Sequence, residues 1–446
     1  MLNNQTSKSA HFSILLLVIG AGFILQMAWL LASLRYLPLI GDGELYWTRS
    51  LTILHAYFSK LDKQGPLFPI FLALNRVLFP SHPMIMAKIE QLVLHALETV
   101  LIYFLAAKFS SRKAALVAGI IAYFYPELLS FEFILFSETL FLGFFLAGVL
   151  AYFHALEIDA GKKKYGYLAL SGALNGIAAL TRASNLYFLA FYLIHLFIFG
   201  RRGLKERVVA GLVFTLAMLA PVSVQTIKNY RLVGCFIPVD ISPVRAQYMY
   251  HNFPEPIDHD FRGYWDMSPQ DPCAGMNFCD QRKCATRRSI KFIAGHPGLS
   301  ARHSVTKVLN LFAPNLYIYK VIFSADLQQY PGLKIYQGRW LRVIGSGSYL
   351  LLMLLAFLGM SLAKEWKLRS FTLFLICYYT AACMATLGAS RYRMPIMPFM
   401  IIYAGNLLAT TREELKAIPR WKLLLAMLVW LAFFGALFSR LVLVLK

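Results

Sequence analysis

Hydrophobic residues in this sequence gather in long runs that are separated by short polar segments. A typical run is about 20 residues long, the length that an α-helix needs to cross the roughly 30 Å apolar core of a bilayer. The runs do not alternate apolar and polar positions, which excludes the strands of a membrane barrel. We therefore expect about eleven spans, at approximately 11–34, 84–107, 113–130, 134–155, 166–181, 185–200, 207–227, 342–363, 369–387, 394–410 and 421–444.

Two segments between the spans are too long to be simple connectors. Residues 35–83 follow the first span, and residues 231–340 form a large loop before the eighth. An amphipathic stretch at 47–60 predicts a helix that lies on the membrane surface, and so does an apolar stretch at 67–79, which is too short to span and carries Arg76. A basic amphipathic stretch at 284–310, interrupted at His296, predicts another.

The expected fold is therefore an all-α polytopic membrane protein with three parts. These parts are an N-terminal transmembrane region over 1–230, the large loop over 231–340 and a C-terminal transmembrane region over 341–446. The first span is too long for a cleavable signal peptide, and no small-residue cleavage site follows it.

Composition supports this class. The chain is 58% hydrophobic and 15% charged, with a mean hydropathy of +0.57. Soluble domains are typically about 45–50% apolar and about 25% charged.

The net charge of +22 follows the predicted topology. Basic residues crowd five short loops on one side, whereas the three short loops on the other side hold only Arg182, Arg391 and Arg393. The positive-inside rule then puts the first set in the cytoplasm, with the N-terminus, and the C-terminus outside. The basic excess thus implies no nucleic-acid partner. The crowded set is Lys108, Arg112, Lys113, Lys162, Lys163, Lys164, Arg201, Arg202, Lys205, Arg207, Lys364, Lys367, Arg369, Arg412, Lys416, Arg420 and Lys422.

Four of the six cysteines, Cys235, Cys273, Cys279 and Cys284, fall in the outer loop. An even number in an oxidising compartment favours disulfides, and we expect at least one among these four. The C-x5-C-x4-C spacing is a poor match to zinc patterns, so no metal site is expected there.

Candidate catalytic groups follow the first span. Asp42 and Glu44, flanked by Gly41 and Gly43, suggest an acid/base pair on a flexible turn near the bilayer surface, with Tyr46 beside it. A solvated loop is the plain alternative.

Charged residues at the outer ends of other segments are candidates for substrate binding. Lys63 suits a phosphate as a compact charge, although a lysine that reaches the headgroups is an equal alternative. Glu138 opens the fourth span and Arg182 closes the fifth. Arg391 and Arg393 are spaced to clamp an anion. The alternative is that these charged residues at the ends of spans only anchor the helices at the membrane interface.

A polar cluster near the end of the seventh span either forms an interfacial belt or walls an active site. Its members are Gln225, Lys228, Asn229 and Arg231.

The predicted cytoplasmic loops are too short to house a nucleotide-binding domain. Any chemistry on the outer face then needs an activated donor that is already in the membrane, and a lipid-linked phosphate meets that need.

Short segments spread along the chain resemble the C-type (GT-C) superfamily of integral membrane glycosyltransferases, in the branch of the protein O-mannosyltransferases and the lipid A aminoarabinose transferase. In order they are Asp42-x-Glu44-x-Tyr46, KQGPLFPIFLAL, YPELL…SETLF, GALNGIAALTRAS, IKNYRLVGCFIPV, IKFIAGHPGL and SRYRMPIMPF. Each is weak singly, whereas their joint order over most of the chain is specific.

The resemblance implies an inverting transfer of a sugar from a polyprenyl-phosphate donor to a lipid A, glycan or protein acceptor. By position, Asp42 matches the family's loop carboxylate, Lys63 its phosphate-contacting lysine, and Arg391 and Arg393 its late arginine motif. The mannosyltransferases have adjacent acids, whereas Gly43 separates them here, so the role of Glu44 stays open.

Other functions stay open at this point. A transporter or flippase of lipid-linked sugars would show broken, charged mid-membrane helices in two related halves, which the sequence lacks. An O-antigen ligase or polymerase would share the donor but not the early acidic loop. No cofactor is implied, and a divalent cation beside the phosphate remains an alternative. Membrane lipids are the other expected partners.

Overall fold

The computed structural model describes residues 2–32, 39, 41–159, 161–201, 203–241, 273, 275–314, 339–416 and 419–445. Within these ranges the regular structure is helical and contains no β-strand. Seven helices there are long and apolar enough to cross a membrane. This confirms the all-α polytopic class, and the protein is an integral, multi-pass membrane protein.

These seven candidate spans coincide with seven of the expected ones. They are α1 (Leu2–Ala32), α5 (Pro83–Phe109), α6 with α7 (Arg112–Phe124 and Pro126–Ser130), α8 (Glu138–Glu157), α12 (Leu204–Val233), α17 (Arg339–Leu362) and α18 (Trp366–Ala385).

The other four expected spans also coincide with helices, but these are shorter or less apolar along their described lengths. The total of eleven spans therefore stays a prediction. These helices are α9 (Lys162–Thr181), α10 with α11 (Ser184–Tyr187 and Leu189–Phe199), α19 (Met397–Ala409) and α21 (Arg420–Leu445).

The bundle is built from close helix pairs. Helix α9 packs between α8 and α12, α19 packs between α6 and α17, and α21 covers α17. Gly176 lets α9 approach the backbone of α12, because a Cβ atom there would come within 2.2 Å of the Met218 carbonyl oxygen. Small residues allow such close backbone approach in membrane helices. Tyr152, Tyr192 and Phe371 fill the centre with mutually tilted rings.

The described helices of the two long segments, 35–83 and 231–340, gather at one end of this bundle. They are α2 (Asp42–Ser50), α3 (Ile53–Ala56), the 3-10 helix η2 (Tyr57–Ser59), α4 (Leu67–Leu78), α14 (Phe278–Gly295) and α15 (Pro297–Leu311). The break at His296 between α14 and α15 is where the sequence predicts it.

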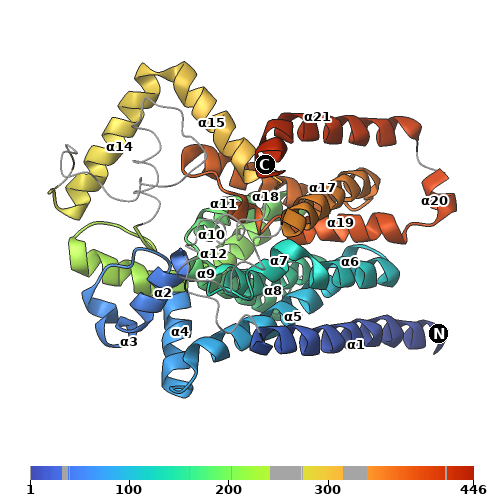
Figure 1. Cartoon of the computed structure of the whole chain (residues 1–446), viewed down its shortest axis with the longest axis horizontal. Helices are drawn as coiled ribbons and strands as arrows, with labels where there is room; N and C mark the ends of the chain where they lie inside the picture. The colour runs from blue at the N-terminus through green and yellow to red at the C-terminus, as the bar shows by residue number, and fades with distance from the viewer. Residues whose placement is uncertain are drawn as a thin grey trace.

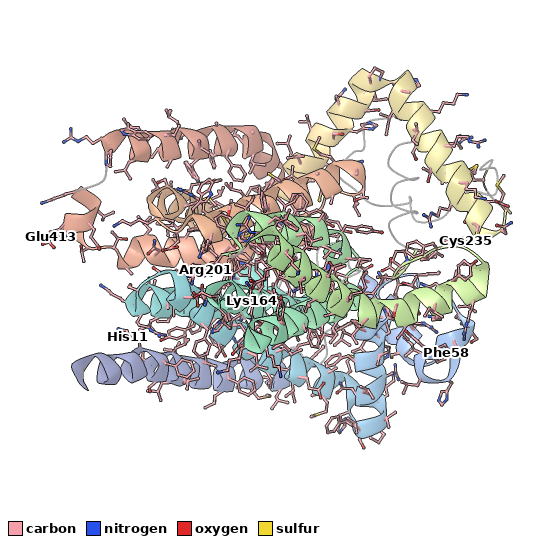
Figure 2. All side chains as sticks on the ribbon, turned by 180° about the vertical axis from the view of Figure 1, so that it is seen from behind. His11, Phe58, Lys164, Arg201, Cys235 and Glu413 are labelled. Atoms are coloured by element: carbon pink, nitrogen blue, oxygen red, sulfur yellow. A yellow bond between two sulfur atoms is a disulfide. The ribbon has the colours of Figure 1, made fainter. Side chains whose placement is uncertain are left out.

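Figure 1 shows α2, α3 and α14 at the end opposite the N-terminus, with α4 lying across the direction of α1. The short helix α20 (Arg412–Lys416) lies near the N-terminal end. Figure 2 likewise separates Phe58 and Cys235 from His11 and Glu413. The described helices α2, α3 and α14 and the connector at 412–416 therefore occupy opposite ends of the molecule, which is consistent with the charge pattern of the loops.

Candidate active site

Asp42 begins a helix rather than lying on a flexible turn, which corrects the expectation from the flanking glycines. Gly41 precedes α2 with φ 60° and ψ −128°, a conformation that suits glycine, and Asp42 is the first helical residue. Residues two apart in a helix point to different sides. Asp42 is accordingly buried and Glu44 is exposed.

A cavity of about 260 Å³ opens beside Asp42. It collects five of the candidates that the sequence singled out, namely Asp42, Tyr46, Lys63, Arg182 and Arg391. Glu44, Glu138 and Arg393 are not among its lining residues. The rest of the lining is Leu45, Gln64, Gly65, Ser137, Thr181, Ala183, Ser184, Tyr187, Asp240, Ile241, Tyr378, Tyr379, Ala382, Cys383, Thr386, Leu387 and Tyr392.

Asp42 forms an ion pair with Arg391, which lies in the 3-10 helix η4 (Ser390–Arg393). Both side chains are about 10% exposed. Burial alone favours the neutral acid, but the charge and hydrogen bond of Arg391 outweigh it, so the pKa of Asp42 lies below its ordinary value. Asp42 is therefore an anion across the physiological pH range.

A second ion pair holds the neighbouring wall. Arg182, just after α9, pairs with Glu138 at the start of α8. The Arg182 guanidinium also lies 5.3 Å from the ring centre of Tyr392, and that of Arg391 lies 5.2 Å from the same ring. Two cations thus lie near one aromatic ring of the cavity, and Glu138 pairs with Arg182 without lining the cavity itself.

Tyr46 completes the side of the cavity formed by α2. Its hydroxyl lies 3.1 Å from the Ser137 Oγ, and its ring packs edge-on against Phe68 of α4. Burial raises the pKa of Tyr46 well above its ordinary value, so the hydroxyl stays protonated.

Arg393 lies apart from Arg391, which corrects the expectation that both arginines clamp one anion. Its side chain is 1% exposed and donates from Nε to Glu127 at 2.8 Å, and it also donates to the carbonyl oxygens of Leu311 and Ala313. Its guanidinium lies 3.8 Å from the ring centre of Tyr349. In a 3-10 turn, residues two apart diverge, so only one of the pair can face the cavity.

The loop that carries Lys63 is pressed against the end of α9. A Cβ atom at Gly65 would come within 2.4 Å of the Thr181 carbonyl oxygen and 2.5 Å of the Leu180 carbonyl oxygen, so only glycine fits. This contact brings Lys63 and Arg182 to the same cavity.

Asp62 anchors the same loop from the other side. Its carboxylate is 2% exposed and accepts hydrogen bonds from Arg49, Gln225 and Lys228. Gln225 and Lys228 are members of the polar cluster at the end of α12. Two cations and an amide around one carboxylate satisfy its lone pairs, as a buried charge requires. This part of the cluster thus holds the wall of the site in place.

The cavity also contains residues that the sequence did not single out. Asp240 and Ile241 come from the outer loop, Tyr187 from α10, and Tyr378 and Tyr379 from α18. Asp240 directly follows the IKNYRLVGCFIPV segment, and that position was the only signal that pointed to it.

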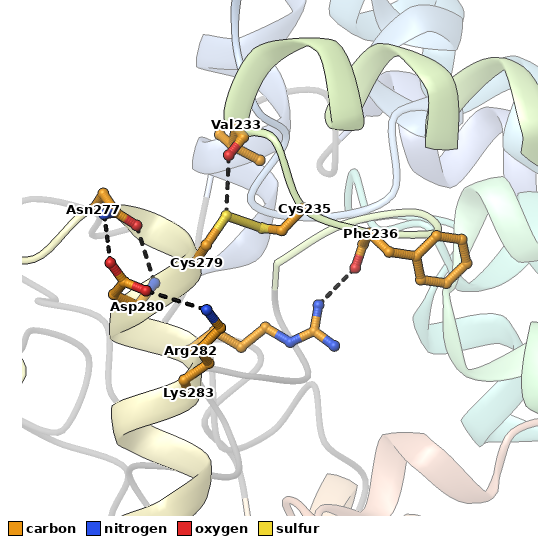
Figure 3. Close-up of a disulfide and its surroundings, with 8 residues drawn as sticks. All are labelled: Val233, Cys235, Phe236, Asn277, Cys279, Asp280, Arg282 and Lys283. Atoms are coloured by element: carbon orange, nitrogen blue, oxygen red, sulfur yellow. Dashed lines mark hydrogen bonds and ion pairs between the residues drawn. A yellow bond between two sulfur atoms is a disulfide. The ribbon is translucent and has the colours of Figure 1, made fainter.

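The structure pairs the four cysteines of the outer loop as Cys235–Cys279 and Cys273–Cys284. Figure 3 shows the first of these bonds joining the chain just beyond α12 to the start of α14. The outer helix hairpin is thus tied to the membrane bundle beside the cavity.

A divalent cation does not fit the described part of the site. No group of three or more His, Cys, Asp or Glu residues suited to a metal occurs in the described ranges. The partner of Asp42 is a guanidinium, which competes with a cation for the same oxygen atoms.

Comparisons with known proteins show what the chain is similar to. Residues 63–224 match the family model described as dolichyl-phosphate-mannose-protein mannosyltransferase. The fold is similar to the Archaeoglobus fulgidus oligosaccharyltransferase AglB in complex with an inhibitory peptide and a dolichol-phosphate, with a TM-score of 0.56 and 14% identity over 98% of this chain. The family model matches part of the chain, and the solved structure shows a fold shared with a GT-C glycosyltransferase. Both findings support the resemblance stated from the sequence.

Other GT-C structures resemble the chain as well. The apo form of the same Archaeoglobus fulgidus enzyme matches with a TM-score of 0.53 and 13% identity, over 98% of this chain and 55% of that one. Apo ArnT from Cupriavidus metallidurans matches with a TM-score of 0.40 and 12% identity, over 90% of this chain and 77% of that one. The chain spans 56% of the AglB chain in the peptide complex. No curated protein matches it significantly.

Proposed function

We propose that this protein is an inverting glycosyltransferase of the GT-C type. It would move a sugar from a polyprenyl-phosphate donor to a lipid, glycan or protein acceptor on the non-cytoplasmic face. The observation that carries the proposal is one cavity that combines a buried carboxylate, Asp42, with three cationic side chains, Lys63, Arg182 and Arg391. Support also comes from AglB, whose structure contains a dolichol-phosphate and a peptide.

The cations fit the leaving group. Breaking the bond between the anomeric carbon and the phosphate oxygen leaves an additional negative charge on the lipid phosphate. Fixed positive groups aimed at that oxygen stabilise the charge as it develops, and their effect is greatest in a site that excludes water. Lys63, Arg182 and Arg391 would hold the phosphate, which then departs without a proton.

Asp42 fits the general base. The acceptor's hydroxyl or amine attacks the anomeric carbon from the side opposite the phosphate and gives its proton to the carboxylate. One carboxylate is sufficient because the leaving phosphate needs no acid, unlike the leaving sugar in glycoside hydrolysis. Inversion of the anomeric centre follows from this single displacement.

The Asp42–Arg391 ion pair couples donor binding to this base. A phosphate that draws the Arg391 guanidinium toward itself weakens the pair and removes the charge that lowers the pKa of Asp42. The carboxylate then becomes more basic only when a donor is present. Such coupling protects the site from unproductive proton transfer.

The location of the cavity favours an enzyme over a flippase. Its walls come from α2, from the loop after η2 and from the C-terminal ends of α9 and α18. Figure 1 shows α2 at the end of the bundle opposite the N-terminus. A carrier places its substrate site near the bilayer midplane, between two related halves. The side of the membrane follows from the charge pattern of the loops.

Replacement of Asp42 by asparagine tests the proposal. Asp42→Asn keeps the shape and removes the basicity, so turnover should fall by about 10²–10⁴-fold. The matched control is Glu44→Gln, an acid on the same helix that is exposed and does not line the cavity, and it should keep wild-type turnover.

Binding of polyprenyl phosphate by both variants would show that the site is still folded. If Asp42→Asn retained more than about a tenth of wild-type turnover, Asp42 would be excluded as the base, because the loss of a general base lowers turnover by more than that.

A further inference from the structure

The segment from Cys235 to Ile241, here called the strap, crosses from α12 to the cavity and is fixed along its length. Its first residue is bound through the Cys235–Cys279 disulfide. The next backbone carbonyl, that of Phe236, accepts a hydrogen bond of 2.6 Å from Arg282 of α14. Figure 3 shows both ties side by side.

Side chains of α12 hold the middle of the strap. The Asn229 amide donates to the carbonyl oxygens of Ile237 and Val239 at 3.1 and 3.0 Å. Gln225 donates to the Val239 carbonyl at 2.9 Å, and Thr226 donates to the Pro238 carbonyl at 3.0 Å. Each of these carbonyls would otherwise need water, so α12 fixes the strap in a single path.

The far end of the strap is joined to the loop that carries Lys63. The Ile241 backbone N–H donates to the Asp62 carbonyl oxygen at 3.3 Å. Asp240 therefore lies beside the residue that precedes Lys63, and both Asp240 and Lys63 line the cavity. Asp240 is 7% exposed and lies close enough to Tyr187 of α10 to interact electrostatically with it.

Asp240 is buried and lies at the end of this fixed segment. A segment with so many fixed points is what a preorganised binding group requires.

We propose that Asp240 binds the sugar of the donor by accepting hydrogen bonds from its hydroxyl groups, with Tyr187 beside it. This inference rests on the proposed function, because it takes the donor to be a polyprenyl-phosphate sugar. The sugar is bonded directly to the phosphate that Lys63 would hold, and the Ile241–Asp62 hydrogen bond places Asp240 next to Lys63. Asp240 is therefore within reach of the ring that follows the phosphate.

The chemistry of the pair suits a sugar. A carboxylate accepts hydrogen bonds through two oxygen atoms, and the adjacent hydroxyls of a sugar ring are spaced to meet both. The aromatic ring of Tyr187 can pack against the apolar face of the sugar ring. Asp240 would thus be a specificity-determining residue, whereas Asp42 carries the proton transfer.

Binding of two lipids to the full-length protein in detergent separates these roles. One probe is decaprenyl phosphate, which carries no sugar. The other is a panel of decaprenyl-phosphate monosaccharides, with mannose, glucose, galactose and arabinose. The variants are Asp240→Asn and Tyr187→Phe, and the matched control is Asp280→Asn, an exposed acid that is also in the disulfide-linked region. Thermal unfolding and non-reducing electrophoresis report whether each variant is folded with its disulfides intact.

The wild-type protein should bind at least one sugar-bearing lipid more tightly than the sugar-free lipid. Asp240→Asn should lose about tenfold or more of that gain, the usual contribution of hydrogen bonds to a charged group, while its affinity for decaprenyl phosphate stays unchanged. Asp280→Asn should match the wild type with both probes.

Equal weakening of both lipids by Asp240→Asn, or no change in either, would overturn the sugar site. So would unchanged donor binding accompanied by a raised KM for the acceptor, because Asp240 would then serve the acceptor. Failure of the wild-type protein to bind any polyprenyl phosphate would instead contradict the proposed function itself.

Discussion

The two arginines of the SRYR segment should fail in different ways when each is replaced by glutamine. Arg393 is 1% exposed, and its removal would leave the buried carboxylate of Glu127 without its cation. The carbonyl oxygens of Leu311 and Ala313 would lose a donor as well. Breaking one side of a buried ion pair costs about 3–5 kcal/mol, so Arg393→Gln should be strongly destabilised.

Arg391 faces the cavity, where its loss should affect the donor more than the fold. Arg391→Gln should remain folded and should bind polyprenyl phosphate at least about tenfold more weakly, because it loses a charge-assisted contact. The assay is thermal unfolding in detergent, measured together with polyprenyl phosphate binding. A second control is the double variant Glu127→Gln with Arg393→Gln, which leaves no lone charge and should recover part of the stability.

The division between the two arginines would be wrong if Arg393→Gln kept wild-type stability and lost donor affinity. That outcome would place Arg393 at the phosphate, as the spacing in the sequence first suggested. If Arg391→Gln lost stability but kept its donor affinity, the assignment of Arg391 to donor binding would be wrong.

Three further changes test the geometry of the site. Burial raises the pKa of Asp42, whereas the positive charge and hydrogen bond of Arg391 lower it by more. Arg391→Gln should therefore move the acid limb of the profile of kcat/KM against pH to higher pH. An unchanged limb would exclude Asp42 as the titrating base. Gly65→Ala should push the Lys63 loop away from α9 and lower turnover, and wild-type kinetics would show that this contact does not position the loop. Replacing Cys235 and Cys279 together by serine should lower the free energy of unfolding by about 4 kcal/mol for a loop of this length. Unchanged thermal unfolding would show that the disulfide does not stabilise the outer region.

Much of the architecture followed from local patterns in the sequence. The length and polarity of the apolar runs predicted helices that the structure contains. The side of the membrane that each short loop faces stays a prediction from the charge bias. Proline after His296 predicted the break between α14 and α15, which the structure shows. Each of these features depends on residues close together in the chain, so periodicity and composition are sufficient to reveal them.

Resemblance and residue chemistry also identified most of the candidate site. Five of the eight candidate acids, bases and binding residues line the cavity. They are polar residues at the outer ends of apolar segments, where a charge has few structural uses in a membrane protein. The sequence alone therefore determined the class of protein, its broad topology and the residues from which a site could be built.

Only the tertiary structure decided which of these residues meet. Asp42 and Arg391 are separated by 349 positions, and their contact depends on how α2 docks against η4. Helix formation from Asp42 onward turned Glu44 outward, and the 3-10 turn sent Arg393 toward Glu127 instead of the cavity. Asp240 was identified as a candidate only from the structure, in which side chains of α12 and α14 fix the strap that carries it. Spacing in the sequence cannot determine these outcomes, because the direction of a side chain is set by the helix that holds it and by the distant partners that pack against it.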